Sequence, residues 1–169
     1  KGTCPVRVDA LGEAGHASTP SIGANAVPLL GEVLRRVGQG MPEPADHPAV
    51  RSMLDALLGD GAVDRLGLAE AIAAAARLHE SWEHTIPAVA GITMAPTMLH
   101  GSAARNVMPA RAGVELDCRI LPGTTEDEVL DAVRRLLGDD LAYELSQPEA
   151  AVHGNASDPS GPLWDLVAA

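Results

Sequence analysis

The sequence has 169 residues, 46% hydrophobic and 21% charged, which fits one soluble globular domain or one domain with an insertion. Its net charge of −11 argues against a nucleic-acid partner, because phosphate binding requires clustered Lys and Arg. No apolar run approaches the roughly 20 residues of a membrane span, so no membrane partner is expected. No signal peptide is recognisable, and we expect a cytoplasmic protein.

The first part of the chain predicts a strand and then a helix. Apolar and polar residues alternate over residues 3–11, as in a strand with one buried face. After a turn-rich segment, Asn25 is a favourable N-cap for a helix over residues 26–37. Apolar residues recur at helical spacing along it until Gly38. Residues 39–47 are expected to be a linker.

The middle of the chain predicts a helical insertion. Residues 48–58 and 64–81 have the apolar spacing of two amphipathic helices, and together they define an insertion over about residues 40–83. Residues 85–95 predict a strand, with a proline near its start, where proline is tolerated. Residues 96–105 are expected to form a loop or to continue that strand with a bend.

The last part predicts strand, helix and strand. Residues 107–121 alternate as a long strand. Thr125 and Glu128 form the capping-box pattern of a helix that Gly138 closes. Residues 141–145 predict a short final strand.

Without the insertion, the predicted order is β-α-β-β-α-β. This order is typical of the ferredoxin-like sandwich, an α+β fold in which a four-stranded antiparallel sheet carries its helices on one face. The other face is left uncovered, and by alternation it carries four charged residues: Arg7, Asp9, Asp117 and Arg119. Folding does not require charge there, although a solvated face often carries it.

Three residues have the chemistry to grip a carboxylate or a polarised carbonyl. His16 lies in a Gly-rich turn, where an imidazole can donate to a developing oxyanion, although a loop histidine is more often simply exposed. Asn106 is ambiguous, because asparagine is common in turns. Arg119 can clamp a carboxylate with two parallel bonds. Its alternative is an ion pair with Asp9 or Asp117.

The sequence predicts no metal site. The segment HESWEH, residues 79–84, lacks the spacing that places two histidines on one helical zinc face, so a solvated helix end is preferred. Three histidines are isolated in predicted loops: His47, His100 and His153. Cys4 and Cys118 lie in strand-like runs, where two reduced core thiols are favoured over a disulfide or a metal site.

Two segments of the sequence, taken together, point to one protein family more specifically than any single residue in them does. They read GEAGHASTPSIGANA over residues 12–26 and APTMLHGSAARNVMPARAGVELDCRILPG over residues 95–123. With the predicted order of elements, they resemble the dimerisation (lid) domain of the M20 metallopeptidases, which include aminoacylases, carboxypeptidases and deacylases. The resemblance runs from about Gly2 to Gln147. One departure is HGSAAR, residues 100–105, in place of a more usual Gly-Gly pair.

The resemblance implies a role for each candidate residue. His16 matches the histidine of the G-H-A/S-S-x-P motif, which reaches across a homodimer to stabilise the oxyanion in the partner's active site. Asn106 matches the asparagine of N-V-I-P, and Arg119 matches the arginine of D-x-R-x-x-P-G. Both are implied to hold the substrate's carboxylate.

The resemblance also implies a longer parent enzyme. Residues 1–147 would be its lid, and residues 148–169 a linker and the start of a helix into a metal-binding domain. The parent would hydrolyse an amide bond next to a free carboxylate, in an N-acyl amino acid or a C-terminal peptide bond, with two divalent ions, expected to be zinc. The family's metal ligands have no match in this sequence. We therefore expect no cofactor in this chain and no activity from it alone.

Two alternatives remain open. The chain could be a stand-alone ferredoxin-like module in which Arg119 and Asn106 bind a small carboxylate. It could also be a purely structural oligomerisation module.

Overall fold

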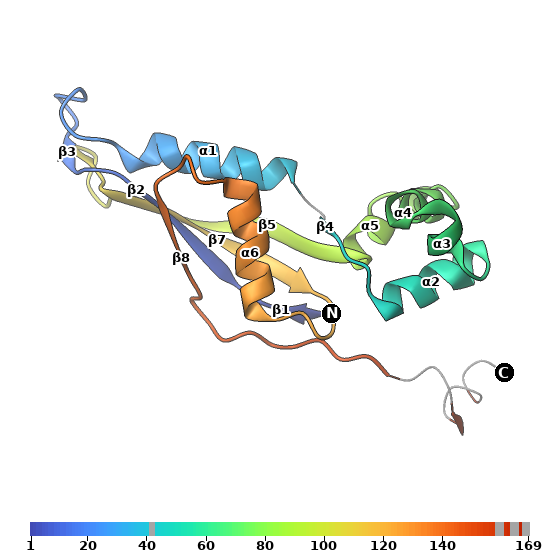
Figure 1. The fold of residues 1–169 in the computed structure, drawn as a ribbon. Helices are drawn as coiled ribbons and strands as arrows, with labels where there is room; N and C mark the ends of the chain where they lie inside the picture. Colours follow the sequence, from blue (N-terminus) through green and yellow to red (C-terminus); the bar gives the residue numbers. More distant parts are fainter. Residues whose placement is uncertain (41–42, 158–160, 163–165, 167–169) are drawn as a thin grey trace.

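An antiparallel sheet forms the centre of the computed structural model, which describes residues 1–40, 43–157, 161–162 and 166 (Figure 1). The main strands are β2 (Val6–Leu11), β5 (Gly91–His100), β7 (Arg111–Ile120) and β8 (Tyr143–Ser146). Their order is β5-β7-β2-β8, and each neighbouring pair is antiparallel. This is the strand order of the ferredoxin-like sandwich, and it confirms the predicted α+β fold.

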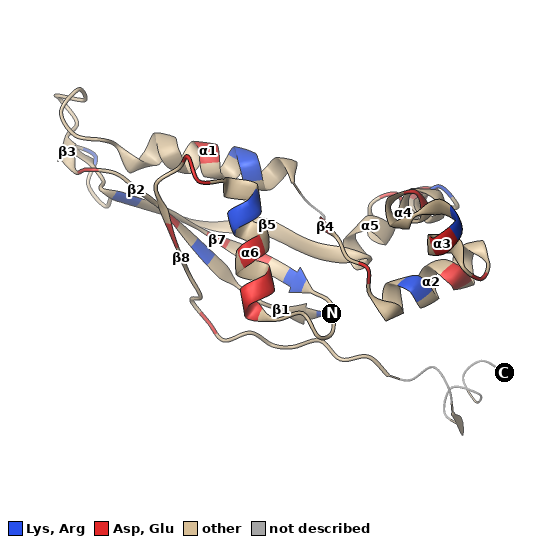
Figure 2. Ribbon diagram, in the orientation of Figure 1, with Lys and Arg blue, Asp and Glu red and all other residues tan. Residues whose placement is uncertain are grey.

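Two helices cover one face of this sheet, α1 (Ala26–Gln39) and α6 (Glu126–Leu137) (Figure 1). The side chain of Asn25 caps α1, and the reciprocal capping box of Thr125 and Glu128 begins α6. Figure 2 shows acidic residues in the first turn of α6 and basic residues in its last turn, which suits the helix dipole. Both predicted caps are confirmed.

The hydrophobic residues form two separate clusters. The main core lies between the sheet and the two helices, and its largest fully buried members are aliphatic: Val6, Val8, Val33, Val37, Val114, Leu116, Ile120, Val129, Val133 and Leu137. The second cluster lies within the helical insertion: Val50, Leu54, Val63, Ile72 and Ile86, with Leu121 packed against them. The insertion therefore has a small core of its own.

The helical insertion extends past its predicted end near residue 83, to Val89, and contains more elements than the sequence predicts. They are β4 (Glu43–Pro44), α2 (Pro48–Leu58), α3 (Ala62–Leu66), α4 (Leu68–Ala76), the 3₁₀-helix η1 (Glu80–Trp82) and α5 (Thr85–Val89). The single helix predicted over residues 64–81 is wrong, because Gly67 adopts a φ of 80° between α3 and α4 and α4 ends at Ala76. The strand predicted over residues 85–95 is correct only from Gly91 onward, because residues 85–89 form α5. Pro87 lies in the first turn of α5, where its missing N–H costs nothing.

Prolines also divide two predicted strands. Pro5 separates β2 from β1 (Gly2–Thr3), and both pair with β7. Pro109 separates β7 from β6 (Val107–Met108), which leaves the main sheet and pairs with β3 (Gly15–His16). A proline donates no backbone hydrogen bond, so the ladder breaks at each position.

Strand β5 runs on to His100 after a register shift between Pro96 and Met98. Of the two alternatives for residues 96–105, the bent continuation is confirmed as far as His100, and residues 101–105 form a loop. The helix predicted near the end of the chain falls largely on residues 158–160, 163–165 and 167–169, outside the described residues. Across the described ranges, no helix combines the length and apolar character needed to cross a membrane.

Candidate functional site

The pairing of β3 with β6 brings His16 and Asn106 together from segments far apart in the sequence. His16 is the register partner of Val107, and the backbone N–H of Ala17 donates to the carbonyl oxygen of Asn106 at 3.0 Å. The pair lies at one end of the molecule, beside the start of α1 (Figure 1). Two of the three predicted site residues are therefore neighbours.

The loop that carries His16 is held closed at its base. Glu13 and Ala24 exchange two backbone hydrogen bonds of 2.6 and 3.1 Å. A Cβ atom on Gly15 would lie 2.5 Å from Met108 Cε and 2.6 Å from the carbonyl oxygen of Ile22. Only glycine fits this close approach, which explains one glycine of the GEAGHASTPSIGANA segment.

The His16 imidazole is exposed, and its Nδ1 atom faces back into its own turn. The backbone N–H of Ser18 donates to Nδ1 at 3.2 Å, and the Ser18 hydroxyl lies 2.7 Å from the same atom. The turn is closed by a bond of 3.0 Å from the Thr19 N–H to the His16 carbonyl. Ser18 is the serine of the G-H-A/S-S-x-P motif, but no role was predicted for it from the sequence. The available signal was the His-x-Ser spacing, which recurs at residues 79–81.

Arg119 lies on β7 between Thr3 of β1 and Thr93 of β5. Its Nη2 donates to Asp117 Oδ2 at 2.7 Å, and 52% of its side chain is exposed. Of the two ion pairs weighed as alternatives, the one with Asp117 is present, whereas Asp9 binds other arginines. The pair is exposed enough that its net stabilisation is small.

Arg119 is distant from His16 and Asn106 within one chain. It lies eight residues beyond Arg111, the start of β7, and a strand rises by about 3.3 Å per residue, so the separation along β7 is roughly 25 Å. The β3–β6 pair lies beyond the Arg111 end of β7. A single chain therefore does not present all three residues to one small ligand.

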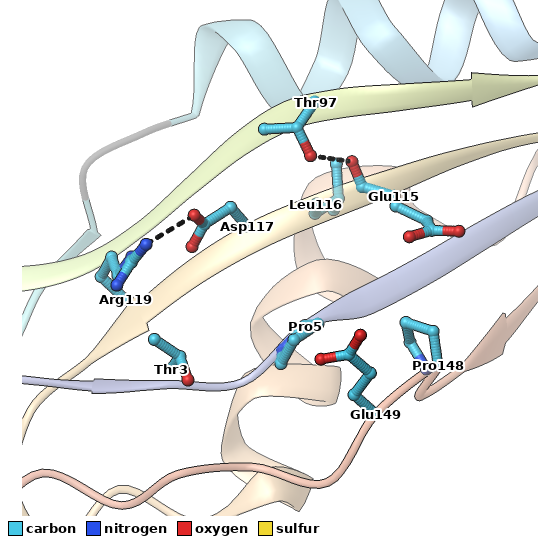
Figure 3. Close-up of a pocket in the computed structure, with 9 residues that line it drawn as sticks. All are labelled: Thr3, Pro5, Thr97, Glu115, Leu116, Asp117, Arg119, Pro148 and Glu149. Atoms are coloured by element: carbon cyan, nitrogen blue, oxygen red, sulfur yellow. Dashed lines mark hydrogen bonds and ion pairs between the residues drawn. The ribbon is translucent and has the colours of Figure 1, made fainter.

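Arg119 and Asp117 line a shallow hollow of about 250 Å³ on the sheet face that the helices leave uncovered (Figure 3). Its other polar side chains belong to Thr3, Thr97, Glu115 and Glu149. The three carboxylates make most of the hollow unfavourable for an anion. The Arg119 guanidinium is the one group in it that attracts a carboxylate.

The rest of the uncovered face is an internally satisfied charge network. The Asp9 residue is only 8% exposed. Arg7 Nε donates to both of its carboxylate oxygens, at 3.1 Å each, and Arg111 Nη1 donates to Oδ2 at 3.2 Å. Arg111 also donates to Glu144 at 2.8 Å. Arg7 and Asp9 point to this face as predicted. They already bond to each other, and Asp9 also bonds to Arg111 of β7.

The prediction for His100 was also wrong. It was expected to be isolated in a loop, but it ends β5, and its Nε2 lies 2.8 Å from Glu115 Oε1 on β7. The prediction was wrong because the strand continues past its bend. This contact ties β5 to the charge network rather than marking a separate site.

No metal site is present among the described residues, where no group of three or more His, Cys, Asp or Glu side chains is arranged to hold an ion. In the HESWEH segment, His79 Nδ1 instead accepts the N–H of Ser81 at 3.2 Å. Cys4 and Cys118 are buried and free, as predicted. Burial raises the pKa of Cys118 to about 12, so it is a poor metal ligand and nucleophile.

Residues 1–144 match the family described as the peptidase dimerisation domain, found in M20 peptidases. No curated protein matches the sequence. The fold is similar to the aminobenzoyl-glutamate utilization protein from Klebsiella pneumoniae, with a TM-score of 0.53 and 15% identity over 94% of this chain and 30% of that one. It is also similar to the dipeptidase Dug1p from Saccharomyces cerevisiae, with a TM-score of 0.50 and 13% identity over 97% of this chain and 38% of that one.

The two structural likenesses concern the fold, and the chain spans 30% and 38% of the lengths of those proteins. The family match covers residues 1–144 of the 169. It includes both segments that carry the candidate residues, from the turn of His16 to the strand of Arg119. This chain belongs to the M20 peptidase dimerisation domain family.

Proposed function

We propose that the chain is the lid and dimerisation domain of a metal-dependent hydrolase that cleaves an amide bond next to a free carboxylate. The substrate would be an N-acyl amino acid or a peptide cut at its C-terminal bond. The observation that carries the proposal is the β3–β6 pairing, which brings the backbone of His16 and that of Asn106 together at an exposed end of the fold. Residues 1–147 would form the lid, and residues 148–169 would lead to the rest of the parent.

Self-association through the same end of the molecule is part of the proposal. Large apolar side chains are exposed by 42–67% at this end and along the adjoining part of β5: Ile22, Val27, Met98, Leu99 and Val107. Strand β4 pairs only with Gly91 and Ile92, so in the described structure the outer edge of β5 beyond Ile92 has no strand partner. An open edge next to exposed apolar groups favours association with a second chain. A homodimer formed here would carry His16 towards its partner.

The separation of Arg119 from Asn106 suggests which chain of a dimer supplies each residue to an active site. If both side chains hold one substrate carboxylate, they must come from different chains, because roughly 25 Å of β7 separates them within one. We therefore propose that His16 and Asn106 serve the partner's active site. Arg119 would serve the active site of its own parent chain.

Each side chain has a defined chemical task in this proposal. His16 donates an imidazole N–H to the oxygen of the scissile carbonyl as charge develops on it. Asn106 donates its amide N–H, and Arg119 its guanidinium fork, to the carboxylate. The metal ions implied by the family, which we propose to be two zinc ions, do not fit any group of described residues. No step assigned to this chain passes through them.

We also propose a cytoplasmic location. The two buried cysteines are free, and structural thiols persist unpaired mainly in reducing compartments.

Subunit mixing in the full-length parent tests the proposal. His16→Ala and Arg119→Ala should each lower kcat/KM by about 10²–10³. Mixing the two inactive dimers under exchange should restore about a quarter of wild-type activity, because half the dimers are hybrids and each hybrid has one complete site. No restoration would refute the division between chains. Normal turnover by His16→Ala, with dimer and metal content unchanged, would refute the oxyanion role and leave a purely structural oligomerisation module.

The Arg119 donors left unused among the described residues favour one second candidate, a stand-alone module that binds a small carboxylate. Arg119 uses only Nη2 in its bond to Asp117, so its Nε and Nη1 donors are available to a ligand in the described structure. Titration of this chain with N-acetylglutamate, followed by NMR, separates the two. Saturable binding that is lost in Arg119→Ala would favour the module, and the lid proposal predicts no saturable binding to the single chain.

A further inference from the structure

The hydrogen bonds of His16 determine which ring nitrogen carries the proton. A backbone N–H can only donate, and that of Ser18 points at His16 Nδ1 from 3.2 Å. Nδ1 must therefore present its lone pair. In the neutral ring the proton then lies on Nε2, which points away from the turn and has no partner among the described residues.

We propose that Ser18 is the positioning residue for His16, holding the ring in the Nε2–H form and in one orientation, so that Nε2–H is presented as a donor. This inference rests on the proposed role of His16. The Ser18 hydroxyl approaches Nδ1 more closely than the amide does, at 2.7 Å against 3.2 Å. It is also the one side chain that bonds this exposed ring within the described structure. Without it, the weaker amide contact alone restrains the ring.

The chain contains comparison turns that separate this role from ordinary helix capping. His79 and Ser81 repeat the geometry, with Nδ1 2.8 Å from the hydroxyl and 3.2 Å from the backbone nitrogen, where they cap η1. His47 caps α2 by accepting only the N–H of Ala49, at 3.1 Å, so a cap does not require the hydroxyl. No helix begins at the His16–Ser18 turn, since the next helix, α1, starts only at Ala26.

The first test uses ¹⁵N NMR of the imidazole nitrogens in this chain at about pH 8, where an ordinary imidazole is neutral. In the wild type, His16 and His79 should both show a protonated Nε2 and a bare Nδ1. Ser18→Ala should move the His16 nitrogen shifts towards a mixture of tautomers and leave His79 unchanged. Ser81→Ala is the matched control and should do the reverse. Unchanged His16 shifts in Ser18→Ala would overturn the proposal.

The second test measures turnover in the full-length parent. Ser18→Ala should lower kcat by about tenfold with KM little changed, because Nε2–H matters most where charge develops. Ser18→Thr, which keeps the hydroxyl, should restore most of the loss, and Ser81→Ala should have no effect. If His16→Ala is inactive but Ser18→Ala keeps full turnover, the positioning role fails while the proposed function stands. If His16→Ala is fully active, the proposed function itself fails.

Discussion

Asp9 occupies the space that a side chain on Gly113 would fill. The two residues are register partners on β2 and β7. A Cβ atom at Gly113 would lie 2.2 Å from Asp9 Oδ1 and 3.3 Å from Arg7 Nη2. The nearly buried carboxylate of Asp9 keeps its bonds to Arg7 and Arg111 only because residue 113 lacks a side chain. The charge network of the uncovered face therefore depends on one glycine.

Gly113→Ala should therefore destabilise the chain by about 1–3 kcal/mol, because the methyl group displaces Asp9 and leaves buried polar atoms badly paired. Urea unfolding measures the change. Gly31→Ala is the matched control, since Gly31 lies inside α1 with nothing within 4 Å of an added Cβ. That variant should gain about 0.5–1 kcal/mol. Equal stability of Gly113→Ala and the wild type would show that Asp9 can move without cost.

The separate core of the insertion predicts local unfolding. Leu54 is fully buried in the insertion cluster, which the main core does not share. Leu54→Ala should cost about 2–5 kcal/mol, expressed as faster hydrogen exchange in α2–α4 while the sheet stays protected. Leu137→Ala, which opens the main core, should instead raise exchange throughout the chain. Uniform loss of protection in Leu54→Ala would mean that the two clusters unfold as one unit.

Acid should weaken the link between α1 and the segment after α6. Arg36 donates to Asp140 at 2.6 and 2.7 Å, and these bonds lower the pKa of Asp140 from 3.8 to about 2. A carboxyl whose pKa is depressed by folding stabilises the fold above its unfolded pKa, and this contribution disappears as the pH falls towards the folded value. Thermal unfolding between pH 4 and pH 2 should show a smaller loss of Tm in Asp140→Asn than in the wild type. Parallel curves for the two proteins would contradict the link.

The features that the sequence predicted correctly have local causes. Asn25 and the Thr125–Glu128 box act on backbone groups within a few residues, so their effect can be read directly. Two boundaries between elements were not predicted. Each depends on a single residue inside a segment whose apolar residues keep a regular spacing. Gly67 interrupts a pattern that continues on both sides, and Pro87 fits the first turn of a short helix as well as it fits the start of a strand.

The candidate site was predicted only in part, because its geometry depends on long-range pairing. His16 and Asn106 meet through strands of two residues each, which are too short to leave a periodic pattern in the sequence. Ser18 was missed because its partner is a ring nitrogen and not a backbone group that capping rules address. Arg119 was predicted on the correct face of the sheet. Its distance from Asn106 was not predicted, because it depends on the break at Pro109 that separates β6 from β7.

The buried cysteines give a last prediction about the native state. Cys4, between β1 and β2, lies opposite Cys118 of β7, and its backbone N–H donates to the Cys118 carbonyl at 3.0 Å. Burial raises the pKa of both thiols, so neither forms a reactive thiolate at neutral pH. A thiol reagent should label the native chain only as fast as it unfolds, and Gly113→Ala should speed the labelling. An added exposed thiol, Ala103→Cys, should react at once. Rapid labelling of the wild type would mean that the edge around β1 opens without global unfolding.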